Sequence, residues 1–98
     1  MAFAIDPEGA ETRAVHALVD FAGKRVVEIG CGDGRLTRRY ADLAEAVLAV
    51  DPKPDEIDRA LARRPDALRE RVAFRVADVT AEELPAAAFD VGLFARSL

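Results

Sequence analysis

Apolar residues recur along this chain with two different periods. Three segments place them at helical spacing, so that one face of each is apolar: residues 11–21, 35–43 and 54–64. Shorter β-branched or alternating runs predict four strands, at residues 25–29, 46–50, 72–76 and 89–94. Strands and helices alternate, which is typical of βαβ units with right-handed crossovers and a parallel sheet. The pattern therefore predicts an α/β fold.

The periodicity also predicts which helical side chains are buried. Two triplets are expected to point into the core: Leu36, Tyr40 and Leu43 on the second helix, and Ile57, Ala60 and Leu61 on the third. Residues 64–71 are expected to form a turn and a helical extension. Thr80 to Glu83 match the capping box of a further short helix.

The predicted strands differ in how far they should be covered. The first two are almost continuously apolar, as expected for strands buried on both faces. The third alternates and carries Arg75, which suits an edge strand. The fourth, which runs from Phe89 to Phe94, has the pattern of an interior strand although no strand follows it. We expect either a missing C-terminal half or pairing of this strand with another chain, as in a homodimer.

Composition indicates an ordinary globular protein. The 98 residues are 51% hydrophobic and 33% charged, which is enough for one domain over residues 1–98. No apolar run approaches the roughly 18 residues that span a bilayer. The first residues do not show the basic and apolar regions of a secretory signal. A single cysteine, Cys31, excludes an internal disulfide and fits a reducing compartment, so we expect the cytoplasm.

Charge argues against a sequence-independent nucleic-acid binder. Fourteen basic residues are interspersed with eighteen acidic ones, and the net charge is −4. The densest basic patch, Arg35, Arg38 and Arg39, is interpreted as a solvated helix face. His16 is the one histidine and has no companion ligands at metal-binding spacing, so no metal site is predicted. His16 lies in the first predicted helix and forms no paired motif with Cys31, which disfavours Cys31 as a catalytic nucleophile.

A glycine-rich turn, Gly30-Cys31-Gly32-Asp33-Gly34, follows the first of these strands and opens a helix. Glycines in this context allow positive φ or close approach of a ligand. The turn lacks the Gly-Lys-Ser/Thr ending of a P-loop, and Arg35 stands where a dinucleotide fingerprint requires glycine. Glu28 and Asp33 add two carboxylates that disfavour a pyrophosphate. A cationic or zwitterionic ligand fits the turn better.

Acidic residues also end the next two strands. Asp51 closes the second strand, where an acid can accept hydrogen bonds from both hydroxyls of a ribose. Asp78 closes the third and could receive an exocyclic amine such as that of adenine. The three strand ends therefore predict a site for a nucleoside with a positively charged appendage and no phosphate.

Four segments resemble, in order and spacing, the first motifs of class I S-adenosylmethionine-dependent methyltransferases. They are "VVEIGCGDG", "AVLAVDP", "VAFRVADV" and "FDVGLF". The resemblance implies a Rossmann-like parallel sheet with strand order 3-2-1-4 and flanking helices. It also implies S-adenosylmethionine as the cofactor and transfer of a methyl group to an unidentified acceptor.

The resemblance assigns cofactor contacts to individual residues. Gly30, Cys31 and Gly32 match positions near the methionine and ribose portions. Glu28 matches the acid that orders the turn and helps to hold the methionine amino group. The remaining matches are Asp51 for the ribose, Pro52 beside the adenine, Asp78 and Val79 for the adenine edge, and Phe94 and Ala95 for the methionine pocket.

The chain departs from the family in length. The family sheet has the order 3-2-1-4-5-7-6, and this chain supplies four of those strands, without the loops that help to form the acceptor site. The leading hypothesis is therefore the cofactor-binding half of a methyltransferase, with no catalytic residue assigned. A non-catalytic nucleoside-binding module is the alternative, and an NAD-dependent oxidoreductase fragment is disfavoured by Arg35 and Asp33.

Overall fold

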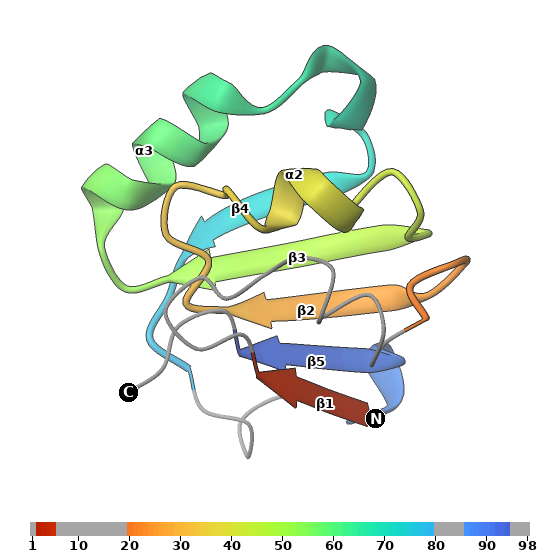
Figure 1. Cartoon of the computed structure of the whole chain (residues 1–98). Coiled ribbons are helices and arrows are strands. Elements are labelled where there is room, and N and C mark those ends of the chain that lie inside the picture. Colours follow the sequence, from red (N-terminus) through yellow and green to blue (C-terminus); the bar gives the residue numbers. More distant parts are fainter. Residues whose placement is uncertain (1, 6–19, 80–85, 95–98) are drawn as a thin grey trace.

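A five-stranded parallel sheet forms the centre of the molecule (Figure 1). The computed structural model describes residues 2–5, 20–79 and 86–94. The strands follow the order β1-β5-β2-β3-β4 across the sheet, and every neighbouring pair is parallel. Their bounds are β1 Ala2–Ile5, β2 Arg25–Ile29, β3 Ala46–Asp51, β4 Val72–Val76 and β5 Val91–Phe94. The four predicted strands are thus confirmed, and β4-β3-β2-β5 is the predicted order 3-2-1-4.

The place of β1 corrects one expectation. The open edge of the fourth predicted strand is taken by the N-terminal segment of the same chain, with Ala2 opposite Val91 and Ile5 opposite Phe94. Since β5 has β2 on its other side, both its edges are hydrogen-bonded. A homodimer that pairs through the strand from Phe89 to Phe94 therefore has no free edge to use. In the seven-stranded order of the family, a fifth strand occupies this place.

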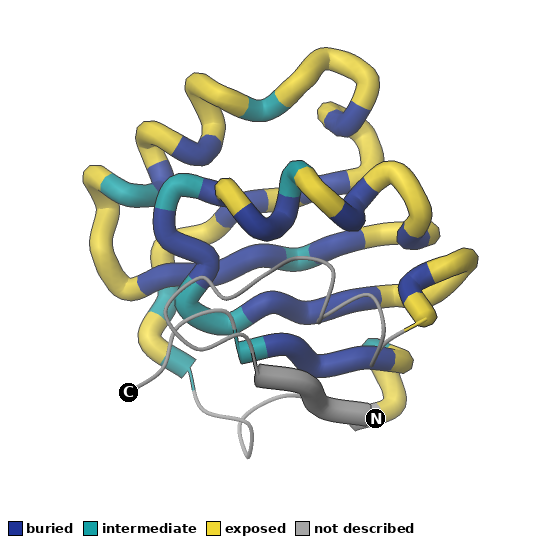
Figure 2. Tube along the Cα trace, viewed as in Figure 1, coloured by how far each residue is buried: buried dark blue, intermediate teal, exposed yellow. Residues whose placement is uncertain are grey.

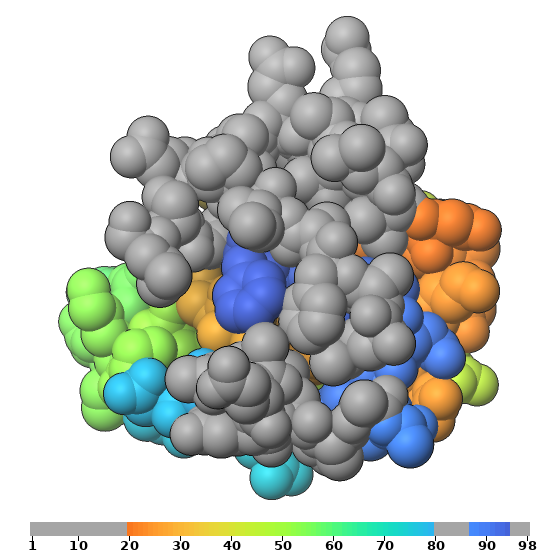
Figure 3. All heavy atoms as spheres, turned by 90° about the horizontal axis from the view of Figure 1, so that it is seen from below, coloured from red at the N-terminus to blue at the C-terminus, as the bar shows by residue number. Residues whose placement is uncertain are grey.

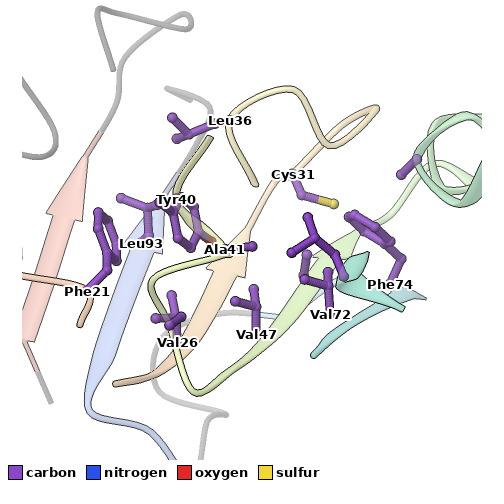
Figure 4. Close-up of a cluster of buried hydrophobic side chains, with 14 of the residues drawn as sticks. Phe21, Val26, Cys31, Leu36, Tyr40, Ala41, Val47, Val72, Phe74 and Leu93 are labelled. Atoms are coloured by element: carbon purple, nitrogen blue, oxygen red, sulfur yellow. The ribbon is translucent and has the colours of Figure 1, made fainter. Parts of the chain in front are cut away.

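Two helices, α2 (Thr37–Tyr40) and α3 (Pro54–Arg63), contribute side chains to one face of the sheet. Figure 4 shows Tyr40, Ala41 and Leu36 on this face with Val26, Val47 and Leu93 of the strands. Pro54 at the first position and Arg63 in the last turn suit the ends of α3. Two 3₁₀ turns, η2 (Asp66–Leu68) and η4 (Ala86–Ala88), complete the described elements. No helix in this part of the chain is long and apolar enough to cross a membrane.

The buried faces of the helices differ from the prediction at two leucines. Leu43 is 47% exposed and Leu61 is 43% exposed. Helix α2 ends at Tyr40, and the tight turns that follow, with Leu43 N–H donating to the Tyr40 carbonyl, rotate Leu43 outward. Leu61 lies on α3, which packs over β3 and the edge strand β4, and no described strand lies beyond β4 to cover the outer side of this helix. Ile57 and Ala60 are buried as predicted.

Burial along the strands agrees with their predicted places (Figure 2). Val26 and Val27 are both buried, so β2 is covered on both faces, whereas β4 alternates between buried and exposed residues. Phe94 at the end of β5 is half-buried. Figure 3, which views the molecule from below relative to Figure 1, shows the last described residues in dark blue at the surface. Residues 11–19 of the predicted helix at residues 11–21, which include His16, and the capping box at residues 80–83 lie outside the described residues, and the last two positions of that predicted helix, Asp20 and Phe21, are not helical.

An ion pair joins the beginnings of β2 and β5. The Asp90 carboxylate accepts hydrogen bonds from the Arg25 N–H at 2.9 Å and from its guanidinium at 3.2 and 3.3 Å, and Asp90 N–H donates to the Arg25 carbonyl at 2.8 Å. The Arg25 side-chain hydrogen bonds, with the backbone one, hold the pKa of Asp90 at about 2, below its ordinary value of 3.8. The pair therefore stabilises the fold when Asp90 is ionised.

This pair predicts a specific acid sensitivity. A carboxyl group whose pKa is lower in the folded chain contributes stability above its unfolded pKa, and that contribution is lost as the pH falls through the folded pKa. The difference in unfolding free energy between the original chain and Asp90→Asn should be constant above about pH 5 and shrink as the pH falls towards 2. Urea titrations followed by circular dichroism measure it, and Arg25→Gln should show the same pH profile. A difference that is unchanged between pH 4 and pH 2 contradicts the prediction.

Candidate site at the C-terminal edge of the sheet

The residues that the resemblance singles out lie along one edge of the sheet, where the parallel strands end (Figure 1). Register brings Val50 of β3 and Phe94 of β5 to the two sides of Ile29 at the end of β2. Along this edge follow Gly30, Cys31 and Gly32 after β2, Asp51 and Pro52 at the end of β3, Asp78 and Val79 after β4, and Phe94 at the end of β5. Ala95 lies outside the described residues. Ligands of open α/β sheets bind at such an edge.

The predicted adenine-binding residues lie farther out than the glycine turn. Ala77 N–H donates to the Asp51 main-chain carbonyl at 3.0 Å, which keeps β4 beside β3 up to this point. Asp78 follows directly and is exposed, Val79 is half-buried, and Pro52 is exposed. These three residues therefore border the turn on the side of β4.

The glycine turn is hydrogen-bonded to the end of β3. The N–H groups of Gly30 and Cys31 both donate to the Val50 carbonyl, at 2.8 and 3.0 Å, and Gly32 N–H donates to Asp51 Oδ2 at 2.9 Å. Gly30 and Gly32 adopt φ values of 78° and 56°, which a side chain rarely tolerates. These contacts set the course of the chain between β2 and α2.

The second half of the turn is also hydrogen-bonded internally. Gly34 N–H donates to the Cys31 carbonyl at 3.0 Å, and Arg35 N–H donates to Asp33 Oδ1 at 3.2 Å. With the three donors above, four N–H groups of the turn and that of Arg35, the next residue, have partners within the protein. A phosphate cradle requires such N–H groups to point at the ligand. These hydrogen-bonded N–H groups are therefore directed at protein acceptors.

The two carboxylates that were expected to disfavour a pyrophosphate have partners within the protein. Asp33 was expected to repel an anion, but its carboxylate forms an ion pair with Arg63 of α3, and its carbonyl accepts a hydrogen bond from the Arg38 guanidinium at 2.8 Å. Glu28, the second expected repelling charge, is fully buried under α2. Both carboxylates are therefore engaged by side chains of other elements.

Asp51 is the carboxylate at the centre of the edge. It is almost completely buried, at 3% exposure. Its Oδ2 accepts the Gly32 N–H, and its Oδ1 accepts the Lys53 N–H at 3.0 Å, two residues along the chain. Each carboxylate oxygen has a second acceptor position. Asp51 can therefore hold the turn and still accept a hydrogen bond from a ligand hydroxyl.

Glu28 is linked to α2 by two hydroxyl groups. Its Oε1 accepts hydrogen bonds from Thr37 Oγ1 at 2.7 Å and from Tyr40 Oη at 2.6 Å. Desolvation by burial, with the adjacent Glu28 charge, raises the pKa of Tyr40 well above its ordinary value, so the phenol stays protonated and donates. Glu28 thus links β2, which precedes the turn, to α2, which follows it.

Cys31 contributes to the site through its backbone. Its side chain is buried, and Figure 4 shows it in the hydrophobic cluster on the helix side of the sheet. The Sγ atom lies 3.6 Å from the Gly32 carbonyl oxygen. Cys31 is therefore a small buried residue of this cluster.

The sequence did not reveal the partners of Glu28, which precedes the turn, or of Asp33 within it. Thr37 and Tyr40 were not recognised as partners of Glu28, nor Arg63 as the partner of Asp33. A signal was present for the first pair, because hydroxyls at positions 37 and 40 share one helix face with the buried Leu36. No local signal connects residue 63 with residue 33.

Comparisons with known proteins agree with this geometry. A family model described as "Methyltransferase domain" matches residues 26–98. The magnesium-protoporphyrin O-methyltransferase of Rhodobacter capsulatus is 43% identical over 60 residues, which cover 61% of this chain and 27% of that protein. The chain thus spans about a quarter of the length of the curated relatives it matches.

Solved structures show the same architecture. An S-adenosylmethionine-dependent methyltransferase from Mesorhizobium loti superposes with a TM-score of 0.71 and 30% identity, over 84% of this chain and 38% of that one. Phosphoethanolamine N-methyltransferase 1 of Haemonchus contortus, in complex with phosphoethanolamine and S-adenosylhomocysteine, gives 0.58 and 29% identity, over 66% of this chain and 14% of that one.

The close packing of Gly34 against Phe74 and Ala60 can be tested by substitution. Its φ is +82°, and an added Cβ would lie 3.0 Å from Phe74 Cζ and 3.4 Å from Ala60 Cβ. Gly34→Ala should therefore lower the unfolding free energy by both backbone strain and overpacking. Gly23→Ala is the matched control, because its φ is +68° and nothing lies within 4 Å of the added atom.

We expect Gly23→Ala to cost about 1–2 kcal/mol from the left-handed backbone alone. Gly34→Ala should cost roughly 1–3 kcal/mol more, as overpacking does. In a Phe74→Leu background the cost of Gly34→Ala should fall, which a double-mutant cycle by urea denaturation measures. Equal losses for the two glycines contradict the assigned contact with Phe74.

Proposed function

The chain belongs to the class I S-adenosylmethionine-dependent methyltransferase family, and we propose that residues 1–98 form one cofactor-binding domain, the first half of such an enzyme. The observation that carries this proposal is the glycine turn with its N–H groups bonded to β3 and Asp51 beside it. This edge offers acceptor groups rather than phosphate-binding donors. A nucleoside with a cationic appendage and no phosphate is the matching ligand.

The proposed cofactor contacts follow the strand ends. Asp51 accepts hydrogen bonds from the ribose hydroxyls through the acceptor positions that Gly32 and Lys53 leave open. Pro52 packs beside the adenine, and Asp78 and Val79 bind its edge. Gly30, Cys31 and Gly32 contribute backbone near the methionine portion, and Phe94 and Ala95 close the pocket from the end of the fourth predicted strand. Glu28 orders the turn.

S-adenosylmethionine supplies an electrophilic methyl group on a sulfonium. Transfer to an acceptor requires chiefly that the two reactants are held close and in line. The residues of this chain bind and orient the cofactor, and we assign no general base to them. Relatives named for a magnesium porphyrin and for phosphoethanolamine differ widely in acceptor chemistry. The acceptor of this chain therefore stays unidentified.

A small-molecule acceptor is favoured over nucleic acid. The net charge is −4. Several arginines of the described region are paired with carboxylates, as in Arg59 with Asp55, Arg63 with Asp33 and Arg69 with Asp66, which reduces the free basic surface. A reducing compartment, the cytoplasm, remains our expectation and is supported by the single buried thiol of Cys31.

Calorimetry with the 98-residue chain tests the proposed ligand. S-adenosylmethionine and S-adenosylhomocysteine should bind, and NAD should not. Asp51→Ala should weaken binding at least about tenfold, because hydrogen bonds to a charged acceptor contribute about 1.5–3 kcal/mol each. Asp66→Ala is the control, since this exposed aspartate precedes β4 and lies at the opposite end of the strands.

Contrary results are read only from folded proteins. Each variant is first compared with the original chain by circular dichroism, so that a loss of folding is not read as a loss of binding. Absence of binding by both sulfur compounds to the folded original chain refutes the proposed ligand. Undiminished binding by folded Asp51→Ala refutes the role of Asp51.

A further inference from the structure

The base of the glycine turn is closed by a buried polar cluster. Glu28 is two residues before the turn, and Thr37 and Tyr40 are the first and last residues of the helix that follows it. Both hydroxyls donate to the same oxygen, Oε1, at 2.7 and 2.6 Å. Glu28 and Tyr40 are 0% exposed and Thr37 is 1% exposed. The cluster thus joins the strand before the turn to the helix after it.

Three contacts hold the turn and the segments on its two sides. Glu28 binds α2 at the base, Asp51 binds Gly32 in the middle, and Asp33 pairs with Arg63 beyond it. The second and third contacts attach the turn to β3 and α3. The Glu28 contacts alone, among these three, set the distance between the two arms of the turn. They therefore decide where the first residues of α2 lie relative to β2.

Tyr40 is itself held in place. Its ring stacks on Phe21 with a centroid separation of 4.3 Å and an interplanar angle of 16°. Figure 4 shows the two rings side by side, next to Leu93 of β5. With the ring fixed, the hydroxyl oxygen is held 2.6 Å from Glu28 Oε1, and the protonated phenol donates to it. Glu28 therefore receives two hydrogen bonds from side chains with little freedom.

A buried carboxylate in this place needs a reason beyond stability. Removing an ionised group from water costs several kcal/mol, and apolar groups of similar volume often stabilise a core at least as well. Satisfied buried networks instead rigidify a structure and specify one arrangement. A ligand site gains affinity when its binding-competent arrangement is already populated.

We propose that Thr37 and Tyr40 are positioning residues for the cofactor, which act by holding the Glu28 carboxylate and through it the glycine turn. Glu28 then serves the cofactor without touching it, because no part of the residue is accessible from outside. This inference rests on the proposed function. It differs from a direct contact between Glu28 and the methionine amino group, which requires the negative charge of Glu28.

Conservative variants separate the two roles. Tyr40→Phe removes one hydroxyl and keeps the ring stacked on Phe21, and Thr37→Val removes the other at nearly constant volume. Thr37→Ser keeps the hydroxyl and is the rescue control. Glu28→Gln keeps an acceptor oxygen and removes the charge. Val72→Ala, at the beginning of β4 and away from the turn, is a control for a general loss of core packing.

The measurement is the dissociation constant for S-adenosylhomocysteine by calorimetry, with urea denaturation of each variant. Tyr40→Phe and Thr37→Val should each weaken binding about tenfold, as expected for one hydrogen bond to a charged group, and the double variant should weaken it further. Thr37→Ser should bind like the original chain. Val72→Ala should lose stability with unchanged affinity, which separates positioning from a merely structural contribution.

Two results overturn the inference. One is affinity in the folded Tyr40→Phe and Thr37→Val double variant equal to that of the original chain. The other is a larger loss in Glu28→Gln than in the double variant, because that order indicates direct contact with a cationic ligand. If the original chain itself binds neither S-adenosylhomocysteine nor S-adenosylmethionine, the proposed function fails instead, and the two failures are distinguishable.

Discussion

The carbonyl oxygen of Val50 makes the contact on which the rest of the site depends. It accepts the N–H groups of both Gly30 and Cys31, so the chain that leaves β2 is drawn over the end of β3 before it reaches α2. Asp51, the next residue, continues this attachment through Gly32. Since β2 and β3 are buried strands within the sheet, the turn is fixed to the best-packed part of the molecule.

Most of the fold could be predicted because the pattern of apolar residues that marks a strand or a helix is visible within a few consecutive residues. The runs that form β2 and β3 are apolar on both faces, and β4 shows its edge position in the alternation of Val72, Phe74 and Arg75. The strand β1 could not be found this way, since four residues before "DPEG" carry no period. Its pairing with β5 depends on contacts far apart in sequence. The outward positions of Leu43 and Leu61 depend on where α2 ends and where the sheet ends.

The site could be predicted where a residue type in a given position has a specific structural role. Glycines between a strand and a helix indicated the turn, and an acid at the end of the next strand indicated Asp51. The prediction did not identify the partners of Asp33 and Glu28. Their partners, Arg63 on one side and Thr37 with Tyr40 on the other, come from other elements. Such pairings follow from tertiary placement, which periodicity and propensity do not encode.

A turn between a strand and a helix can bind a ligand through backbone N–H donors or through acceptor groups such as carboxylates. Here the N–H groups of Gly30, Cys31 and Gly32 point to β3, so they are not offered to a ligand. The side chains at the same edge are carboxylates, with Asp51 at the centre and Asp78 beside β4. Acceptors select groups that donate, such as hydroxyls, amines and ammonium, and they disfavour phosphate. The class of ligand therefore follows from the direction of three N–H groups more than from the topology of the sheet.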